Sequence, residues 1–151
     1  MNKVLFGEQN IILDLDAKDK QDALLQMTKK MESLGVVSDT KQFLEYVKTR
    51  ESYSTTGIGN GIAIPHGKGD VVQETSVLFA RLLHPIQWDS VDGEPVSLIF
   101  LMAVPNSDAG SEHLKTLAYI SGRLMDETII QNLKVATIKS DIVNLFTFEQ
   151  E

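Results

Sequence analysis

The feature that most constrains the fold of this chain is an apolar run from Val96 to Val104. The run includes a single polar side chain, Ser97, and Pro105 follows directly. Successive residues of a strand point to opposite faces of a sheet, so a strand that is apolar throughout must be covered on both faces. Proline donates no N–H to a sheet, and we expect the strand to end there. The run therefore predicts a central strand between two covering layers.

Other segments alternate in polarity or are rich in β-forming residues, which predicts further strands. The predicted strands are Ile11–Asp16, Ile62–Ile64, Ser76–Leu83 and a short one at Ile86–Asp89. In the first strand, Leu13 and Leu15 would face one side of the sheet and Asp14 and Asp16 the other. In the third, one side would carry Val77, Phe79, Arg81 and Leu83, and the other Leu78, Ala80 and Leu82. Asp92–Gly93 predicts a turn before the central strand.

Helices are predicted where apolar residues recur three or four positions apart. They cover about residues 18–34, Asp39 to Arg50, a stretch after Ser111 with Leu114, Leu117, Ala118, Ser121, Leu124 and Met125, a short segment at 129–133, and residues 138–148. Expected caps are Asp16 or Asp19 with Gly35 for the first helix, Asp39 with Gln42 for the second, and Ser111 for the third. Because helices alternate with strands, we expect an α/β fold, a single domain over residues 1–151 with a mixed sheet and helices on both faces.

The composition excludes several classes of function. The 151 residues contain no cysteine, so neither a thiolate nucleophile nor a zinc–cysteine site is available. The net charge of −7 argues against a broad nucleic-acid-binding face. No apolar run approaches the roughly 18 residues that a membrane span needs, and the N-terminus lacks a signal-peptide core. We therefore expect a cytoplasmic protein that does not insert into a membrane.

A glycine-rich segment, residues 55–70, holds five of the ten glycines and contains the sequence Ile64-Pro65-His66. Pro65 fixes its own φ and favours extended geometry at Ile64, so a short strand would deliver His66 at its end. We expect the histidine between a Gly/Asn turn and a second glycine-rich turn. Gly67 and Gly69 would leave space around the ring and let backbone N–H groups face an anion. A glycine-rich loop with an incidental surface histidine is the alternative.

Two other residues are candidates for an anion site. Arg50 continues the apolar stripe of Phe43 and Val47, so it either meets an anion at the edge of the domain or interacts only with the helix dipole. His113 falls in the first turn of a helix, where an anion is stabilised and an imidazolium is disfavoured. The alternative for His113 is an exposed first-turn histidine. His84, at a strand end, is assigned no role.

The stretch Gly57 to Lys68 resembles the active-site segment of enzyme IIA of the bacterial sugar phosphotransferase system. The class is the fructose/mannitol/nitrogen class, or type 2, and the likeness is greatest to a fructose-specific IIA subunit. Further segments fall where this family has them: Arg50, Asp92 to Pro95, Leu98 to Pro105, and Glu112 to Lys115. The similarity extends over about residues 11–148 and implies the α/β fold expected above.

The resemblance implies a phosphoryl relay. His66 would be the nucleophile, phosphorylated through Nε2, because a neutral imidazole is nucleophilic at physiological pH. His113 would orient the phosphoryl group or donate a hydrogen bond to it, and Arg50 would supply fixed positive charge. Weaker candidates for phosphate binding are Thr55, Thr56 and Gly67. Such a relay needs neither a nucleotide nor a metal cofactor.

The resemblance also implies the partners of the relay. The donor would be the histidine-containing phosphocarrier protein HPr, and the acceptor a cysteine of an enzyme IIB. The membrane enzyme IIC would be served only indirectly, and no nucleic acid is involved. An apolar rim around His66, including Ile58 and Ile62, would meet these partners. The sequence does not reveal the sugar or the oligomeric state.

Three alternatives remain beside the sugar relay. A nitrogen-type regulatory IIA would carry the same phosphohistidine but act by binding other proteins, and Gly57 to Lys68 occurs in both branches. Asp89 and Gly93-Glu94-Pro95 favour the fructose-like branch. A metallohydrolase using His66 and His113 lacks a third ligand at recognisable spacing. A non-catalytic binding module would leave Arg50 or His113 dispensable.

Overall fold

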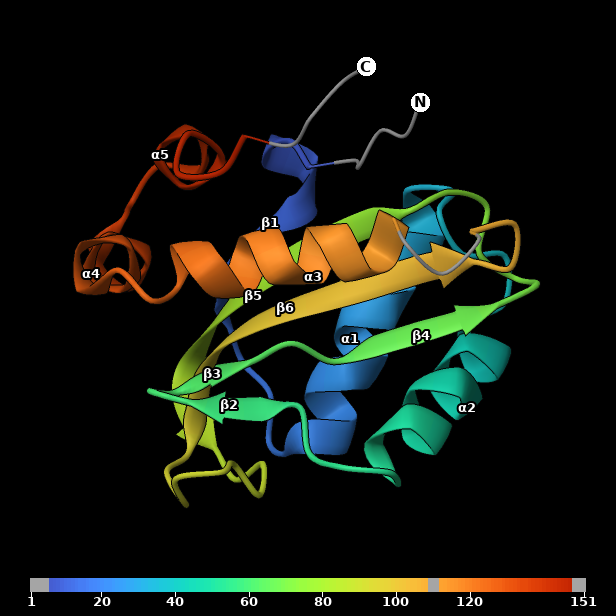
Figure 1. Cartoon of the computed structure of the whole chain (residues 1–151), viewed down its shortest axis with the longest axis horizontal. Coiled ribbons are helices and arrows are strands. Elements are labelled where there is room, and N and C mark those ends of the chain that lie inside the picture. The colour runs from blue at the N-terminus through green and yellow to red at the C-terminus, as the bar shows by residue number, and fades with distance from the viewer. Residues whose placement is uncertain (1–5, 109–111, 148–151) are drawn as a thin grey trace.

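The computed structural model describes residues 6–108 and 112–147, and it contains a six-stranded sheet with helices on both faces (Figure 1). The strands are β1 (Ile11–Leu15), β2 (Gly57–Gly59), β3 (Ile62–Ala63), β4 (His66–Gly69), β5 (Ser76–Ile86) and β6 (Val96–Pro105). The α-helices are α1 (Lys20–Ser33), α2 (Thr40–Glu51), α3 (Glu112–Arg123), α4 (Glu127–Val135) and α5 (Lys139–Val143), and a 3-10 turn, Glu8–Asn10, precedes β1. The predicted α/β class is confirmed.

The sheet is mixed, and β6 is its central strand. The strand order is β1-β5-β6-β3-β2, and β4 pairs with β6 beyond β3 on the same side. β5 is antiparallel to β6, whereas β3 and β4 are both parallel to it. β1 is parallel to β5, and β2 is antiparallel to β3. Apart from Ser97 and Pro105, every residue of β6 is buried, which confirms the interpretation of the apolar run.

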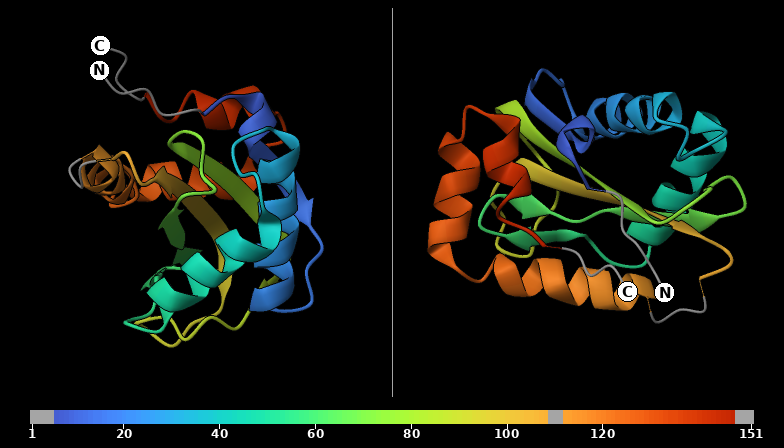
Figure 2. Two further views of the ribbon diagram at one scale, coloured as in Figure 1. Left: turned by 90° about the vertical axis from the view of Figure 1, so that its right-hand side faces the viewer. Right: turned by 90° about the horizontal axis from the view of Figure 1, so that it is seen from above.

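Two hydrophobic cores lie on opposite faces of the sheet, and the side views separate the two helical layers (Figure 2). α1 and α2 cover one face, which buries Ala23, Leu24, Met27, Met31, Phe43 and Val47 against Leu78, Ala80, Ile99 and Leu101. α3, α4 and α5 cover the other, which buries Ile120, Leu124, Ile129, Leu133 and Ile142 against Val77, Phe79, Leu98 and Phe100. The predicted alternation of β5 is therefore confirmed for the buried positions from Val77 to Leu82.

The predicted alternation of the first strand is wrong, because the strand is bulged. Asp14 has a positive φ of 58°, and the pairing with β5 shifts register between Ile12 and Leu15. The extra residue turns the following side chain to the other face. Leu13 consequently packs in the core beneath α3, whereas Leu15 belongs to the core beneath α1.

Two helix caps are confirmed by hydrogen bonds. The Asp19 carboxylate accepts from Asp22 N–H at the start of α1, and the Asp39 carboxylate accepts from Gln42 N–H at the start of α2. Gly35, with φ of 79°, follows the end of α1 as expected. The third predicted cap, Ser111, lies outside the described residues.

One predicted strand, the length of the last helix and the buried face of α3 differ from prediction. The predicted short strand at Ile86–Asp89 does not form, because β5 itself continues to Ile86. The last helix is shorter than residues 138–148, since α5 ends at Val143. The buried positions are Thr116 and Ile120 on α3 and Leu124 just after it, while three residues of the predicted stripe, Leu114, Ala118 and Met125, are exposed. The stripe is therefore rotated toward Ile120, the apolar residue that faces the sheet.

The segment after Pro65 forms a strand and not the predicted glycine-rich turn. β4 pairs with β6 from His66, opposite Met102, to Gly69, opposite Pro105. Gly67 and Gly69 share one face, and α2 lies directly against it. A Cβ on Gly67 would stand 3.0 Å from the Phe43 ring and 3.1 Å from Val47, and one on Gly69 would overlap the ring of Tyr46. The two glycines therefore set how closely α2 approaches the sheet.

Replacing Gly69 with alanine tests this contact. We expect Gly69→Ala to lower the free energy of unfolding by about 1–3 kcal/mol, because the new methyl group forces Tyr46 or the backbone to move. Gly122→Ala is the matched control, since nothing lies within 4 Å of its added Cβ and alanine favours a helix by up to about 1 kcal/mol. Urea unfolding measures both. Equal midpoints for the two variants would contradict the packing argument.

Candidate active site

His66 lies at the junction where β3 ends and β4 begins. Both strands run along the same side of β6, and Pro65 separates them because it has no N–H to contribute. The Pro65 carbonyl accepts from Met102 N–H at 2.9 Å, which holds the junction to the central strand. His66 shares the face of Met102, the face that α3 covers, whereas Gly67 faces α2. The histidine thus stands at a sheet edge that both helical layers reach.

Arg50 contacts His66 directly from the last turn of α2. Its Nε donates to His66 Nε2 at 3.2 Å, and its Nη1 donates to the carbonyl of Ser54 at 2.9 Å. The other ring nitrogen of His66, Nδ1, lies 3.4 Å from the carbonyl of Ile64. A carbonyl can only accept, so this contact places the ring proton on Nδ1 and leaves the lone pair on Nε2. The predicted pairing of Arg50 with the glycine-rich segment is present in the structure.

Burial lowers the pKa of His66 below its usual value of 6.5. The Ile64 carbonyl acts in the opposite direction, while the Arg50 guanidinium and His113 lower the pKa further and Glu51 raises it. Desolvation and neighbouring positive charge both disfavour the imidazolium form. His66 is therefore a neutral base at pH 7, with Nε2 as its nucleophilic atom.

His113 approaches from the opposite helical layer, in the first turn of α3. His113 lies near enough to His66 to lower the pKa of that residue. The His113 N–H donates to Asp108 Oδ2 at 3.0 Å, and the ring Nδ1 lies 3.5 Å from the same oxygen. Asp108 was not among the predicted site residues. The one sequence signal for Asp108 is its position five residues before His113, a histidine in the first turn of a helix.

The three weaker phosphate-binding candidates are differently placed. The Thr56 hydroxyl is buried, donates to Glu51 Oε2 at 2.5 Å and accepts from Trp88 Nε1 at 3.1 Å. The Thr55 hydroxyl contacts the Trp88 carbonyl at 3.4 Å and accepts from Gly57 N–H. Gly67 faces the side chains of α2. The structure therefore gives all three a role in holding the site together. Neither the Thr55 nor the Thr56 hydroxyl donates a hydrogen bond to His66.

Glu51 belongs to a buried polar network that the sequence did not predict. It follows Arg50 in α2 and pairs with Lys20 at 2.8 Å, and its side chain is only 10% exposed. Lys20 also lies over the Trp88 ring, 4.8 Å from the centroid. Together with the Thr56 hydrogen bond, these contacts tie the end of α2 to α1 and to the segment after β5. The network fixes the backbone from which Arg50 extends.

Exposed apolar side chains lie just after α2, on the β2–β3 hairpin and beside that hairpin. Tyr53 follows α2, and Ile58 on β2 is 43% exposed, whereas Ile62 is only 1% exposed and belongs to the core. Burial of Ile62 makes the expected rim wrong for that residue, while the exposure of Ile58 leaves its place in the rim a prediction. Val91, 71% exposed, lies beside the same hairpin because its N–H donates to the Gly57 carbonyl.

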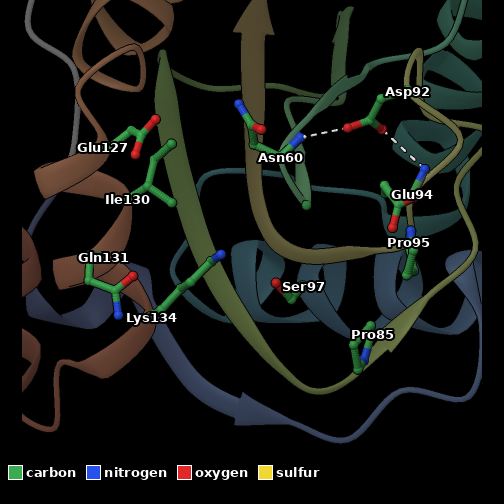
Figure 3. A pocket seen from close by; sticks show the side chains of 11 residues that line it. Asn60, Pro85, Asp92, Glu94, Pro95, Ser97, Glu127, Ile130, Gln131 and Lys134 are labelled. Carbon is green, nitrogen blue, oxygen red and sulfur yellow. Dashed lines mark hydrogen bonds between the residues drawn. The ribbon is translucent and has the colours of Figure 1, made fainter.

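A cleft of about 500 Å³ lies elsewhere, between the β2–β3 turn, the 92–95 loop and α4 (Figure 3). It is lined by Asn60, Gly61, Pro85, Asp92, Glu94, Pro95, Ser97, Glu127, Ile130, Gln131 and Lys134. The Asn60 and Glu94 N–H groups donate to Asp92, which lowers the pKa of that carboxyl. Asp92 is thus a structural acceptor that joins the loop to the turn. None of the predicted site residues lines the cleft.

Residues 6–108 and 112–147 contain neither a cluster of metal ligands nor a membrane-spanning helix. Within that part of the chain, no three histidine or acidic side chains come together as a set of metal ligands. Over the same residues, none of the helices has the length and apolar character to cross a bilayer.

Residues 4–148 match the family model for the phosphoenolpyruvate-dependent sugar phosphotransferase system, EIIA 2. The chain belongs to this family. It is a IIA component of a phosphotransferase system, and the predicted resemblance is confirmed. Components of this kind are phosphotransferases.

Relatives of this IIA chain come from two functional branches. Over 126 residues it is 38% identical to the 2-O-alpha-mannosyl-D-glycerate-specific EIIABC component of Escherichia coli strain K12. The aligned region covers 83% of this chain and 19% of that protein. Over 132 residues it is 38% identical to a nitrogen regulatory protein of Bradyrhizobium diazoefficiens, covering 87% and 85% of the two chains. The chain thus spans about a fifth of the sugar-specific relative and most of the regulatory one.

The fold matches a solved regulatory IIA. The crystal structure of the nitrogen regulatory protein IIA-Ntr from Neisseria meningitidis superposes with a TM-score of 0.87 at 29% sequence identity, over 93% of this chain and 95% of that one. Both the helical layers and the mixed sheet are therefore those of a IIA protein.

The pKa of His66 gives a direct test of the site. We expect its NMR titration midpoint below 6.5, and Arg50→Gln should raise that midpoint by removing a nearby positive charge. Lys48→Gln is the control, because Lys48 is exposed and pairs only loosely with Glu45 at 3.8 Å. A midpoint that is unchanged in Arg50→Gln would contradict the contact.

The lowered pKa of His66 also makes the free energy of unfolding depend on pH. The folded state binds the His66 proton more weakly than the unfolded chain does, so unfolding free energy falls as the pH drops below 6.5. The loss levels off once the pH is below the folded-state pKa. His66→Ala should remove this component from urea unfolding curves measured between pH 7.5 and 5. A pH dependence equal to that of the wild type would contradict the assignment.

Proposed function

We propose that this IIA chain relays a phosphoryl group through Nε2 of His66 in the cytoplasm. HPr is the donor, and a cysteine of an enzyme IIB is the acceptor, which drives uptake and phosphorylation of a fructose- or mannitol-type sugar through enzyme IIC. The observation that carries the proposal is the 3.2 Å contact between Arg50 Nε and Nε2 of a neutral, half-buried imidazole. A lone pair and a fixed positive charge thus meet at one atom.

Phosphoryl transfer requires little beyond the lone pair of His66 Nε2 and the positive charge of Arg50. The Nε2 lone pair attacks phosphorus, the bond from phosphorus to the donor nitrogen breaks, and its electron pair stays with the donor. A cysteine thiolate then attacks the same phosphorus, and the electron pair returns to Nε2. Phosphoryl transfer depends mainly on in-line positioning and on positive charge near the phosphoryl oxygens. Arg50 Nη2 has no protein hydrogen bond among the described residues, so its donors are available to those oxygens.

The second candidate is a regulatory IIA of the nitrogen type. It uses the same phosphohistidine but acts by binding other proteins according to its phosphorylation state. The relative from Bradyrhizobium supports this branch, while the mannosyl-glycerate relative, whose name joins A, B and C parts, supports the sugar relay. Transfer to a IIB protein encoded beside this chain would favour transport, and its absence would favour regulation.

Phosphorylation of His66 is tested by intact mass. After incubation with phosphoenolpyruvate, enzyme I and HPr, wild-type protein should gain one phosphoryl group that is labile in acid and stable in base. His66→Ala should gain none. His84→Ala, which removes an exposed histidine of β5, should be labelled like the wild type. Labelling of His66→Ala would overturn the assignment.

Arg50 and His113 should affect the rates of transfer in different ways. We expect Arg50→Ala to slow phosphorylation of His66 by about tenfold or more while the protein stays folded, because fixed charge stabilises the transferring group. For His113→Ala, labelling should survive in part and onward transfer to IIB should slow. Rapid-quench measurement separates the two steps, and Lys48→Ala serves as control. A large loss of stability in Arg50→Ala would indicate a structural role instead.

A further inference from the structure

The Asp108 carboxylate is buried beside His113 and has no place in the relay as described so far. Its side chain is only 3% exposed. A buried carboxylate is strongly destabilising unless hydrogen bonds or positive charge compensate for its lost hydration. Asp108 Oδ2 accepts from the His113 N–H at 3.0 Å and lies 3.5 Å from the ring Nδ1 of the same residue. Both of these contacts join the Asp108 carboxylate to His113.

The ring of His113 has one nitrogen toward Asp108 and one nitrogen left for the site. Nδ1 is fully buried and makes no hydrogen bond among the described residues, and Asp108 Oδ2 lies 3.5 Å from it. An incoming group can reach the ring only through Nε2. A carboxylate next to Nδ1 favours a proton on that nitrogen, as it does in other carboxylate–histidine pairs. The position of the Asp108 carboxylate therefore favours the tautomer of His113 that carries its proton on Nδ1.

Lys68 connects this pair to the strand that carries the nucleophile. Lys68 lies two positions after His66 on β4, so the two side chains share one face. Its Nζ donates to the Asp108 carbonyl at 3.1 Å. A second contact, from Asn106 to Asp70, joins the same loop to the residue after β4. The carboxylate that orients His113 is thus held against the strand of His66.

We infer that Asp108 is a positioning residue for phosphoryl transfer. It keeps Nδ1 of His113 protonated and turns Nε2 toward the phosphoryl group on His66, while Lys68 holds the backbone of Asp108 against β4. When Nε2 takes up a second proton from solvent, the ring donates that proton as a hydrogen bond to a phosphoryl oxygen. The charged ring then has a carboxylate on one side and phosphoryl oxygens on the other. This inference rests on the proposed function, whereas the tautomer itself does not.

Asp108→Asn separates the electrostatic role from the structural one. Asparagine keeps an oxygen that accepts from the His113 N–H, but it removes the negative charge beside Nδ1. Asp108→Ala removes the acceptor as well. Asp70→Asn is the matched control, because it removes a carboxylate from the segment next to the same loop without contacting His113. Circular dichroism and urea unfolding establish that each variant is folded.

The first readout is independent of phosphorylation. Long-range proton–nitrogen correlation spectra of uniformly labelled protein report which ring nitrogen of His113 is protonated. We expect Nδ1–H as the main neutral tautomer in the wild type and in Asp70→Asn, and a shift toward Nε2–H in Asp108→Asn that is larger in Asp108→Ala. The same tautomer in all four proteins would overturn the inference, whatever the outcome of the phosphorylation test.

The second readout is kinetic. We expect Asp108→Asn to gain one phosphoryl group on His66, as the wild type does, but to pass it to IIB about tenfold to a hundredfold more slowly, the range seen when outer partners of functional histidines are lost. Asp108→Glu should restore part of that rate. Unchanged transfer in folded Asp108→Asn would overturn the inference. Failure of the wild type to be labelled would instead contradict the proposed function and leave the tautomer result standing.

Discussion

The close approach of α2 to β4 is the contact on which the active site depends. Two glycines on one face of the strand let Phe43, Val47 and Tyr46 lie almost against the backbone. Larger residues at Gly67 or Gly69 would push the helix outward by part of a side chain. Arg50 stands one turn beyond Val47, so any such displacement moves its guanidinium away from His66 Nε2. The packing of α2 against the glycines of β4 therefore determines how closely the positive charge of Arg50 approaches His66.

The site also depends on the sheet edge at which His66 stands. Because neighbouring strand residues face opposite sides, His66 points to the layer of α3 while Gly67 receives α2. Arg50 reaches the ring from one layer and His113 from the other. Pro65 leaves the edge without an N–H just before the histidine, so His66 lies at an interruption of the ladder and stays accessible. A half-buried edge position is enough to keep the imidazole neutral without closing it to a protein partner.

Much of the fold follows from local patterns in the sequence, and the exceptions have physical causes. The apolar run at Val96–Val104 predicted a strand covered on both faces because no other environment buries both of its sides. The bulge at Asp14 was not predictable, since a single positive φ reverses the facing of later residues without changing composition. The β4 strand was taken for a turn because glycine usually marks turns. Its glycines serve packing, which only the position of α2 reveals.

The active site was predicted as residue types and not as a hydrogen-bond network. Family likeness gave His66, Arg50 and His113 but could not show that Thr56 is engaged by Glu51 and Trp88. Long-range partners of this kind leave no periodic signal. A relay must hold a phosphoryl group and still release it, and these partners limit how strongly the site binds. The Ser54 carbonyl restrains Arg50, and the Asp108 carboxylate lies beside the His113 ring. The positive field at Nε2 is therefore moderated by anionic and carbonyl oxygens, which suits an intermediate that passes its phosphoryl group onward.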